Sequence, residues 1–155
     1  MNCDAFFQQH SSGYFDREKY GSIVGILARF FRKSAKTDEA DAFIFVTAEY
    51  GHSYPAPLRN ALEYLVQEWA YKPAGIVSYG GISAGTRAMK SLQADLCSLQ
   101  MVPLYEAVNF PLFEKFIHEE RLYANGTSTK AAQTMLSQLA RWTKGLKSIR
   151  EDKDY

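Results

Sequence analysis

Two short apolar runs, each followed by a polar loop and then by a helical pattern, limit the folds open to this chain. Ala42–Val46 is the first run, and the loop after it holds a carboxylate, a tyrosine, a glycine, a histidine and a serine. Further along, Ala74–Ser78 leads into a glycine-rich loop, Tyr79–Arg87. Strands that alternate with helices predict a parallel sheet with helices on both faces. Because the carboxyl ends of parallel strands meet at one edge, the two loops are expected to form one crevice for a ligand.

Helices are predicted where apolar residues recur at helical spacing. One such helix is predicted over Asp16–Ser34. Another begins at Pro57, which suits the first turn of a helix because its missing N–H costs nothing there. The buried stripe of that second helix is expected to contain Leu58, Ala61, Leu62, Leu65, Val66 and Trp69. Two later stripes are formed by Ala88, Met89, Leu92, Leu96 and Leu99, with Cys97 beside them as a small apolar filler, and by Ala132, Met135, Leu136, Leu139, Trp142 and Leu146.

The segment between the last two helices contains a third predicted strand, Met101–Val108, and an irregular stretch, Asn109–Gly126. Thr127 or Ser128 is expected to cap the last helix, since hydroxyl side chains accept hydrogen bonds from the free N–H groups there. The charged tail, Arg150–Tyr155, is expected to fray.

Composition excludes several classes of protein. The chain has 155 residues, the size of one domain, and its hydrophobic content of 46% is enough for a core. A net charge of +1 gives no electrostatic case for nucleic acid. No apolar run approaches the roughly 18–20 residues that span a bilayer, and no secretory signal is recognisable, so a cytoplasmic protein without a membrane partner is expected. The two cysteines, Cys3 and Cys97, match no metal-binding spacing, so no metal site is predicted.

The two loops carry a family resemblance. The segment VTAEYGHSYPAPLRNALEYL, from Val46, resembles the VTPEYN-S-P-LKNALD segment of NAD(P)H-dependent FMN reductases, a flavodoxin-like family that includes quinone and chromate reductases. The segment SYGGISAGTRAMKSLQADLCSLQMVPL, from Ser78, resembles the glycine-rich loop, helix and strand entry that follow in the same family. The similarity extends from about Ala40 to Leu112 and continues weakly to the last helix.

The resemblance implies a flavodoxin-like three-layer α/β sandwich, usually in a homodimer or higher homo-oligomer, with FMN at the carboxyl ends of the strands. The residues of the first loop that would contact the flavin are Thr47, Ala48, Glu49, Tyr50, Gly51, His52 and Ser53. Those of the second loop, near the pyrimidine side of the flavin, are Tyr79, Gly80, Gly81, Ser83 and Gly85. No catalytic side chain is expected, because the cofactor itself carries the hydride chemistry.

The sequence departs from the family pattern at three places. Ala48 replaces the usual proline, and Gly51 stands where asparagine is common. Family members also open with a strand and a G-S-x-R loop whose backbone N–H groups hold the FMN phosphate. Residues 1–40 show no such loop, so the first βα unit is expected to be missing. The chain is interpreted as a single domain, 1–155, with a divergent or truncated part, 1–40, and a family-like core, 41–148; a start at an internal methionine of a longer protein is the alternative.

Individual site residues also have plainer explanations. Glu49 is either a flavin contact or an ordinary solvated carboxylate, and the three glycines of the second loop equally suit a tight turn without a ligand. Arg87 begins a helix, where the dipole disfavours a cation, which indicates an anionic partner. That partner is a cofactor phosphate, a carboxylate across a dimer, or the other half of a surface ion pair.

The resemblance, together with the absence of the phosphate loop, leads to two possible functions. The first is an NAD(P)H-dependent FMN-containing oxidoreductase of the flavin or quinone reductase type, in which FMN takes hydride from NAD(P)H and passes electrons to a small-molecule acceptor. The second is a non-catalytic flavodoxin-like dimerisation or interaction module that has lost tight FMN binding. It is motivated by the missing phosphate loop, because a phosphate without its N–H cradle loses several charge-assisted hydrogen bonds.

Overall fold

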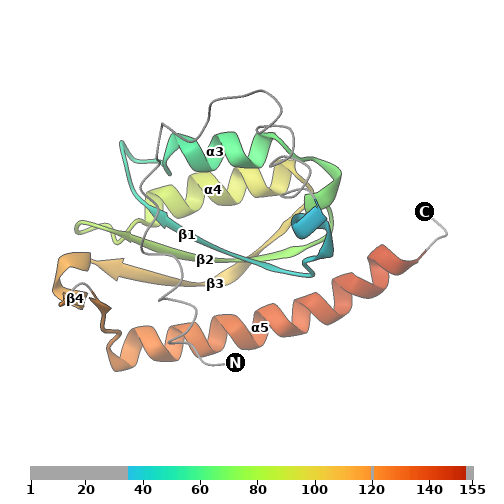
Figure 1. Ribbon diagram of the computed structural model, residues 1–155. Coiled ribbons are helices and arrows are strands. Elements are labelled where there is room, and N and C mark those ends of the chain that lie inside the picture. Colours follow the sequence, from blue (N-terminus) through green and yellow to red (C-terminus); the bar gives the residue numbers. More distant parts are fainter. Residues whose placement is uncertain (1–34, 120, 153–155) are drawn as a thin grey trace.

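The computed structural model describes residues 35–119 and 121–152. Its centre is a parallel three-stranded sheet in the order β1 (Phe43–Ala48), β2 (Pro73–Gly80) and β3 (Val102–Pro111). Two helices, α3 (Ala56–Glu63) and α4 (Thr86–Ser98), lie over one face, and a long helix, α5, lies under the other (Figure 1). The predicted α/β three-layer sandwich is confirmed. The helix predicted over Asp16–Ser34 lies outside the described residues. The segment 1–40, in which no phosphate loop is expected, also lies outside them except for residues 35–40.

Alternation of side chains along the strands fills two separate cores. Phe45 and Ile76 point toward α3 and α4 and pack in the first core, together with Leu62, Trp69, Ala88, Met89, Leu92 and Leu96. Val77 points toward α5 and packs in the second core, together with Leu104, Val108, Phe110, Met135 and Leu139. Neighbouring residues on one strand thus serve opposite layers, and this fixes the register of the sheet.

The helix α3 is shorter than its apolar pattern predicts. It ends at Glu63, and a short 3₁₀ helix, η2 (Gln67–Trp69), follows it. Trp69 still reaches the core, where its Nε1 donates to the carbonyl oxygen of Leu62 at 3.1 Å. Val66 is 65% exposed, so its place in the predicted buried stripe is wrong, because the chain has already left the helix at that point.

The helix α5 (Gly126–Glu151) begins one residue after its cap. Asn125, rather than Thr127 or Ser128, is that cap, and its Oδ1 accepts a hydrogen bond from the Ser128 N–H at 2.9 Å. Trp142 is 46% exposed, contrary to the prediction, because Met135, Leu139 and Leu146 already form the buried line. On α4, Cys97 is exposed as well, since it lies one residue beyond the buried Leu96 and so on another side of the helix.

The strand β3 continues three residues beyond its predicted end and carries an irregularity. Its register against β2 shifts between Ala74 and Ile76, and Tyr105 stands 93% exposed within the shifted stretch. After β3 the chain forms a 3₁₀ helix, η3 (Phe113–Phe116), and a two-stranded hairpin that joins β4 (Ile117–His118) and β5 (Arg121–Leu122). This hairpin replaces part of the irregular stretch that the sequence predicts.

Polar groups tie the start of β1 to the far end of α5. Asp41 accepts from Lys147 Nζ at 2.8 Å and from an Arg150 guanidinium nitrogen at 2.6 Å. Lys72, only 3% exposed, donates through Nζ to the carbonyl oxygens of Thr37 at 2.7 Å and Asp38 at 2.8 Å. Arg150 therefore belongs to an ordered end of α5, where the sequence predicts fraying.

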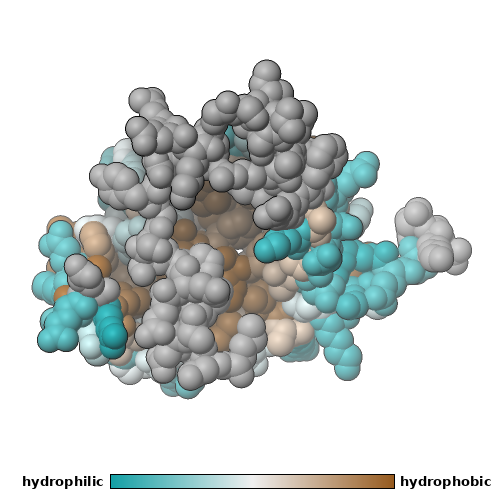
Figure 2. All heavy atoms as spheres, viewed as in Figure 1, coloured by the Kyte–Doolittle hydropathy of each residue, from teal (hydrophilic) through white to brown (hydrophobic). Residues whose placement is uncertain are grey.

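The surface in Figure 2 is hydrophobic mainly at the level of the sheet, between the two helical layers, and hydrophilic at its outer ends. Within residues 35–119 and 121–152, no helix combines the length and the apolar character needed to cross a bilayer.

Candidate functional site

The first loop, which follows β1, ends in a tight turn. The N–H of Tyr50 donates to the carbonyl of Ser53 at 2.8 Å, and the N–H of Ser53 donates back to Tyr50 at 3.0 Å. Gly51 and His52 form the tip, with φ values of 55° and 66°. Two successive left-handed residues are what a two-residue turn of this kind requires. The loop therefore projects as a closed turn whose two tip residues are exposed.

The second loop, between β2 and α4, is anchored by hydrogen bonds to the strand before it. Ser78 Oγ donates to the Ala84 carbonyl at 2.8 Å and accepts from the Asn109 amide at 2.6 Å. Gly85 has φ of 76°, and a Cβ there would lie 2.8 Å from Ser78 Cβ. A residue without a Cβ is thus required at position 85, because the loop passes so close to β2. Ile82 stands at the outside of the loop, 90% exposed.

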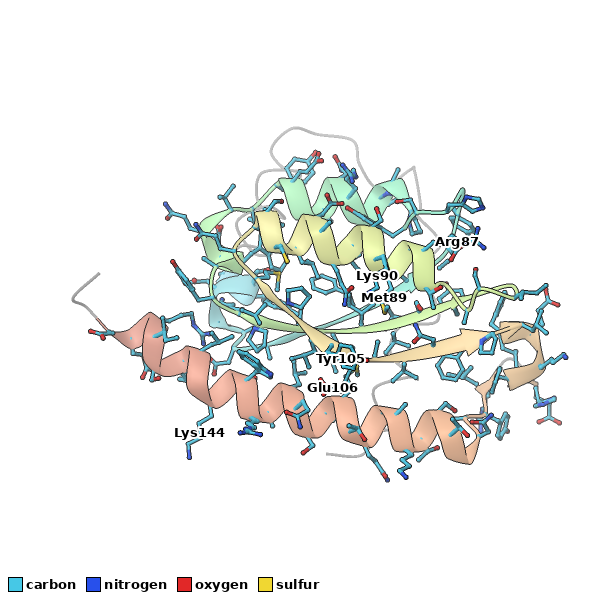
Figure 3. The ribbon with its side chains drawn as sticks, turned by 180° about the vertical axis from the view of Figure 1, so that it is seen from behind. Arg87, Met89, Lys90, Tyr105, Glu106 and Lys144 are labelled. Atoms are coloured by element: carbon cyan, nitrogen blue, oxygen red, sulfur yellow. The ribbon has the colours of Figure 1, made fainter. Side chains whose placement is uncertain are left out.

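Glu49 joins the two loops. Both of its carboxylate oxygens accept from Ser83 Oγ at 3.0 Å, and Oε2 also accepts from the Arg87 N–H at 3.2 Å. The Arg87 guanidinium lies 3.2 Å from Oε1, and the Glu49 side chain is only 9% exposed. Glu49 is therefore not an ordinary solvated carboxylate, because its side chain is almost covered and bonded within the protein. The anionic partner expected for Arg87 is Glu49 of the same chain. Figure 3 shows Arg87 at the end of α4 where the loops meet.

A third segment completes this edge of the sheet. The N–H of Leu112 donates to the Gly81 carbonyl at 2.9 Å, and the Phe113 ring lies 5.2 Å from that of Tyr79. Burial, and after it the charge of Tyr50, raises the pKa of Tyr79. Sequence reasoning missed Leu112 and Phe113, and the only available signal was that both follow the third apolar run, where a third strand end belongs.

The tips of the loops offer the contacts that a flat, carbonyl-bearing ring needs. Among the residues that the structure describes, the N–H groups of Gly51, His52 and Ile82 donate to no protein acceptor. A Cβ added at Gly51 or Gly81 would meet no atom within 4 Å, so both positions border open space. Tyr50 is 69% exposed and adds an aromatic ring. Free donors, open space and apolar side chains are the features of a flavin-ring site.

The part of this edge that the structure describes has little to offer a phosphate. A helix N-terminus attracts anions, but that of α4 already accommodates the Glu49 carboxylate. No cluster of His, Cys, Asp and Glu suited to a metal ion occurs within the described ranges.

The residues predicted for the site fall into two sets. Those that the structure exposes at the tips are Tyr50, Gly51, His52 and Gly81. Those that are buried or bonded within the protein are Thr47, Ala48, Glu49, Ser53, Tyr79, Gly80, Ser83 and Gly85. All of them come together at one edge of the sheet, and only the first set is exposed.

A three-layer sandwich with two linked loops at the carboxyl ends of neighbouring parallel strands is a flavodoxin-like protein. The solved structure of FerB, a flavoenzyme NAD(P)H:(acceptor) oxidoreductase from Paracoccus denitrificans, has the same fold, with a TM-score of 0.55 and 20% identity over 78% of this chain and 69% of that one. The family model for NADPH-dependent FMN reductase matches residues 14–115. The chain belongs to that family.

Curated relatives have a higher sequence identity to this chain. An NAD(P)H-dependent FMN reductase of Schizosaccharomyces pombe is 41% identical over 112 residues, which are 72% of this chain and 46% of the relative. An NADPH:quinone oxidoreductase of Arabidopsis thaliana is 32% identical over 129 residues, 79% of this chain and 64% of the relative. The chain therefore spans about half to two thirds of the length of these two relatives.

Proposed function

We propose that this protein is an NAD(P)H-dependent FMN-containing oxidoreductase of the flavin or quinone reductase type. The observation that carries the proposal is the pair of loops that Glu49 joins, with free N–H donors and exposed apolar side chains at their tips. Relatives named FMN reductase and quinone oxidoreductase support the same activity. We take the whole chain, 1–155, as one domain with its family-like core in 41–148.

In this proposal the protein binds and orients, and it supplies no acid or base. The N–H groups of Gly51, His52 and Ile82 would donate to ring carbonyls, while Tyr50 and Ile82 would cover apolar parts of the ring. Bound FMN would supply hydride acceptance from NAD(P)H and electron delivery to a small-molecule acceptor such as a quinone. Because NAD(P)H and acceptor would use one site in turn, the kinetics would be ping-pong.

The proposed cofactor contacts are with the ring and not with the phosphate. Titration with FMN and with riboflavin, followed by fluorescence quenching, measures the contribution of the phosphate directly. Equal dissociation constants are expected if only the described loops hold the flavin. A much tighter complex with FMN would show that another part of the protein holds the phosphate.

A homodimer in the cytoplasm completes the proposal and rests on the family alone. Size-exclusion chromatography with light scattering measures the oligomeric state.

The visible spectrum of the purified protein, before and after addition of FMN, tests the proposal. Flavin bands that stay with the protein on a desalting column and bleach with NADPH under anaerobic conditions are expected. Tyr50→Ala should weaken retention. Tyr105→Ala should not, because Tyr105 is a still more exposed tyrosine near the start of β3, away from the loops (Figure 3). A wild-type protein that retains no added FMN would overturn the proposal and favour a non-catalytic interaction module.

A further inference from the structure

Three polar residues of α4 lie one above another along the helix. Arg87, Ser91 and Asp95 are spaced by four residues, so their side chains share one side of α4. They lie beside the buried stripe and are partly exposed. We call this set the polar ladder.

The first loop contacts every step of the polar ladder. Glu49, at the start of the loop, pairs with Arg87 at 3.2 Å. Ser53, at the end of the turn, shares a hydrogen bond with Ser91, with 3.0 Å between the two Oγ atoms. Tyr54 follows and donates its hydroxyl hydrogen to Asp95 Oδ2. Consecutive parts of the loop therefore meet consecutive turns of the helix.

The last step of the ladder also includes α3. Arg59 donates to Asp95 Oδ2 at 2.6 Å, and its guanidinium lies over the Tyr54 ring, 5.6 Å from the ring centroid. Tyr54 is only 5% exposed and packs in the core beneath α3 and α4. Asp95 thus binds both the exit of the loop and the helix that follows it.

The exposed turn lies between two fixed points. Glu49 and Ser53 flank the turn, and each bonds to α4, whereas Gly51 and His52 at the tip bond to nothing in the described chain. The ladder therefore fixes the position and direction of the tip, although no ladder residue bonds to Gly51 or His52.

We propose that the polar ladder is a positioning device that holds the first loop in its ligand-binding conformation before any ligand arrives. Ser91 and Asp95 are positioning residues in this scheme, which rests on the proposed function. A loop that is ordered in advance loses less conformational freedom on binding, and affinity rises accordingly. The loss of one net hydrogen bond of the ladder is expected to raise the ratio of disordered to ordered loop about three- to tenfold. Flavin binding should weaken by the corresponding fall in the ordered fraction.

The test compares two serines on one helix. Ser91→Ala removes a ladder contact. The matched control, Ser98→Ala, removes a hydroxyl whose one bond within the described residues is to the Asp95 carbonyl of the same helix, at 2.7 Å. Hydrogen exchange of the Tyr50 and Ser53 amides, measured without ligand, should be about three- to tenfold faster in Ser91→Ala and unchanged in Ser98→Ala. Ser91→Thr keeps the hydroxyl and should restore slow exchange.

Flavin binding gives the second readout. The dissociation constant for FMN should rise in Ser91→Ala in proportion to the fall in the ordered fraction of the loop that the exchange rates give, with the melting temperature close to that of Ser98→Ala. Unchanged exchange in Ser91→Ala, or an affinity that does not follow the ordered fraction of the loop, would overturn the positioning role. Failure of the wild-type protein to bind FMN would overturn the proposed function instead, and the exchange comparison in the ligand-free chain would still decide whether the ladder orders the loop.

Discussion

Replacement of Gly85 by alanine tests the conformation of the second loop without reference to any ligand. Gly85 has a left-handed φ of 76°, and an added Cβ would lie 2.8 Å from both Ser78 Cβ and the Tyr79 nitrogen and 2.9 Å from the Tyr79 oxygen. The left-handed conformation costs a non-glycine residue about 1–2 kcal/mol. Overpacking against a strand that cannot move aside adds about 1–3 kcal/mol. Gly85→Ala is therefore expected to lower the free energy of unfolding by about 2–5 kcal/mol.

Gly81→Ala is the matched control in the same loop. Its added Cβ would meet nothing within 4 Å, and Gly81 is not among the residues with a left-handed φ. The free energy of unfolding should change by less than about 0.5 kcal/mol, as for other surface substitutions.

Urea unfolding followed by circular dichroism measures both variants, and thermal melts provide a second measurement. For a chain of this size, a loss of about 3 kcal/mol corresponds to a melting temperature lower by about 6–12 °C. Equal midpoints for Gly85→Ala and Gly81→Ala would refute the reasoning, because the close approach of Gly85 to β2 would then be absent in solution.

Three further predictions concern buried or paired ionisable groups. Burial and the hydrogen bond to Asp95 raise the pKa of Tyr54 to about 12, so the folded state keeps a proton that the unfolded state loses near pH 10. The free energy of unfolding of the wild type should therefore fall between pH 10 and 12, and urea titrations of Tyr54→Phe should lack this slope. Burial lowers the pKa of Lys72, so wild-type stability relative to Lys72→Met should rise as the pH approaches 10.5, and parallel curves would contradict this. The hydrogen bond from Lys147 lowers the pKa of Asp41, and stability should therefore be lost as the pH falls below 3.8 in the wild type but less so in Asp41→Asn, as acid titration by fluorescence would show.

Local patterns in the sequence predicted the layers of this fold. Apolar runs that stop at polar loops place β1 and β2, and helical spacing places α4 and α5, because each pattern involves residues close together in the chain. The same patterns could not decide which members of a stripe are covered. Trp142 repeats at the right spacing but lies beside the buried line of α5, and only the packing of that helix on the sheet reveals it.

The candidate site shows the same division. The two loops are predictable from the order of strands and helices, and the structure brings all of their predicted residues to one edge of the sheet. The partners of Glu49 are not predictable in this way, because Ser83 and Arg87 lie 34 and 38 residues further along the chain. Such pairings depend on the three-dimensional approach of loop and helix, which composition and spacing do not encode.

The irregular stretch of β3 affects how this protein behaves at high concentration. A regular outer strand presents a row of unpaired backbone groups that another molecule can extend. Here the register of β3 shifts, Tyr105 projects from the shifted stretch, and the Leu104 carbonyl accepts from the Gln93 amide at 3.2 Å. A bulged strand with an occupied carbonyl is a poor template for a further strand. Growth of ordered aggregates along this side is therefore disfavoured, and Gln93→Ala, which frees that carbonyl, should raise the rate of thioflavin-positive aggregation in concentrated samples.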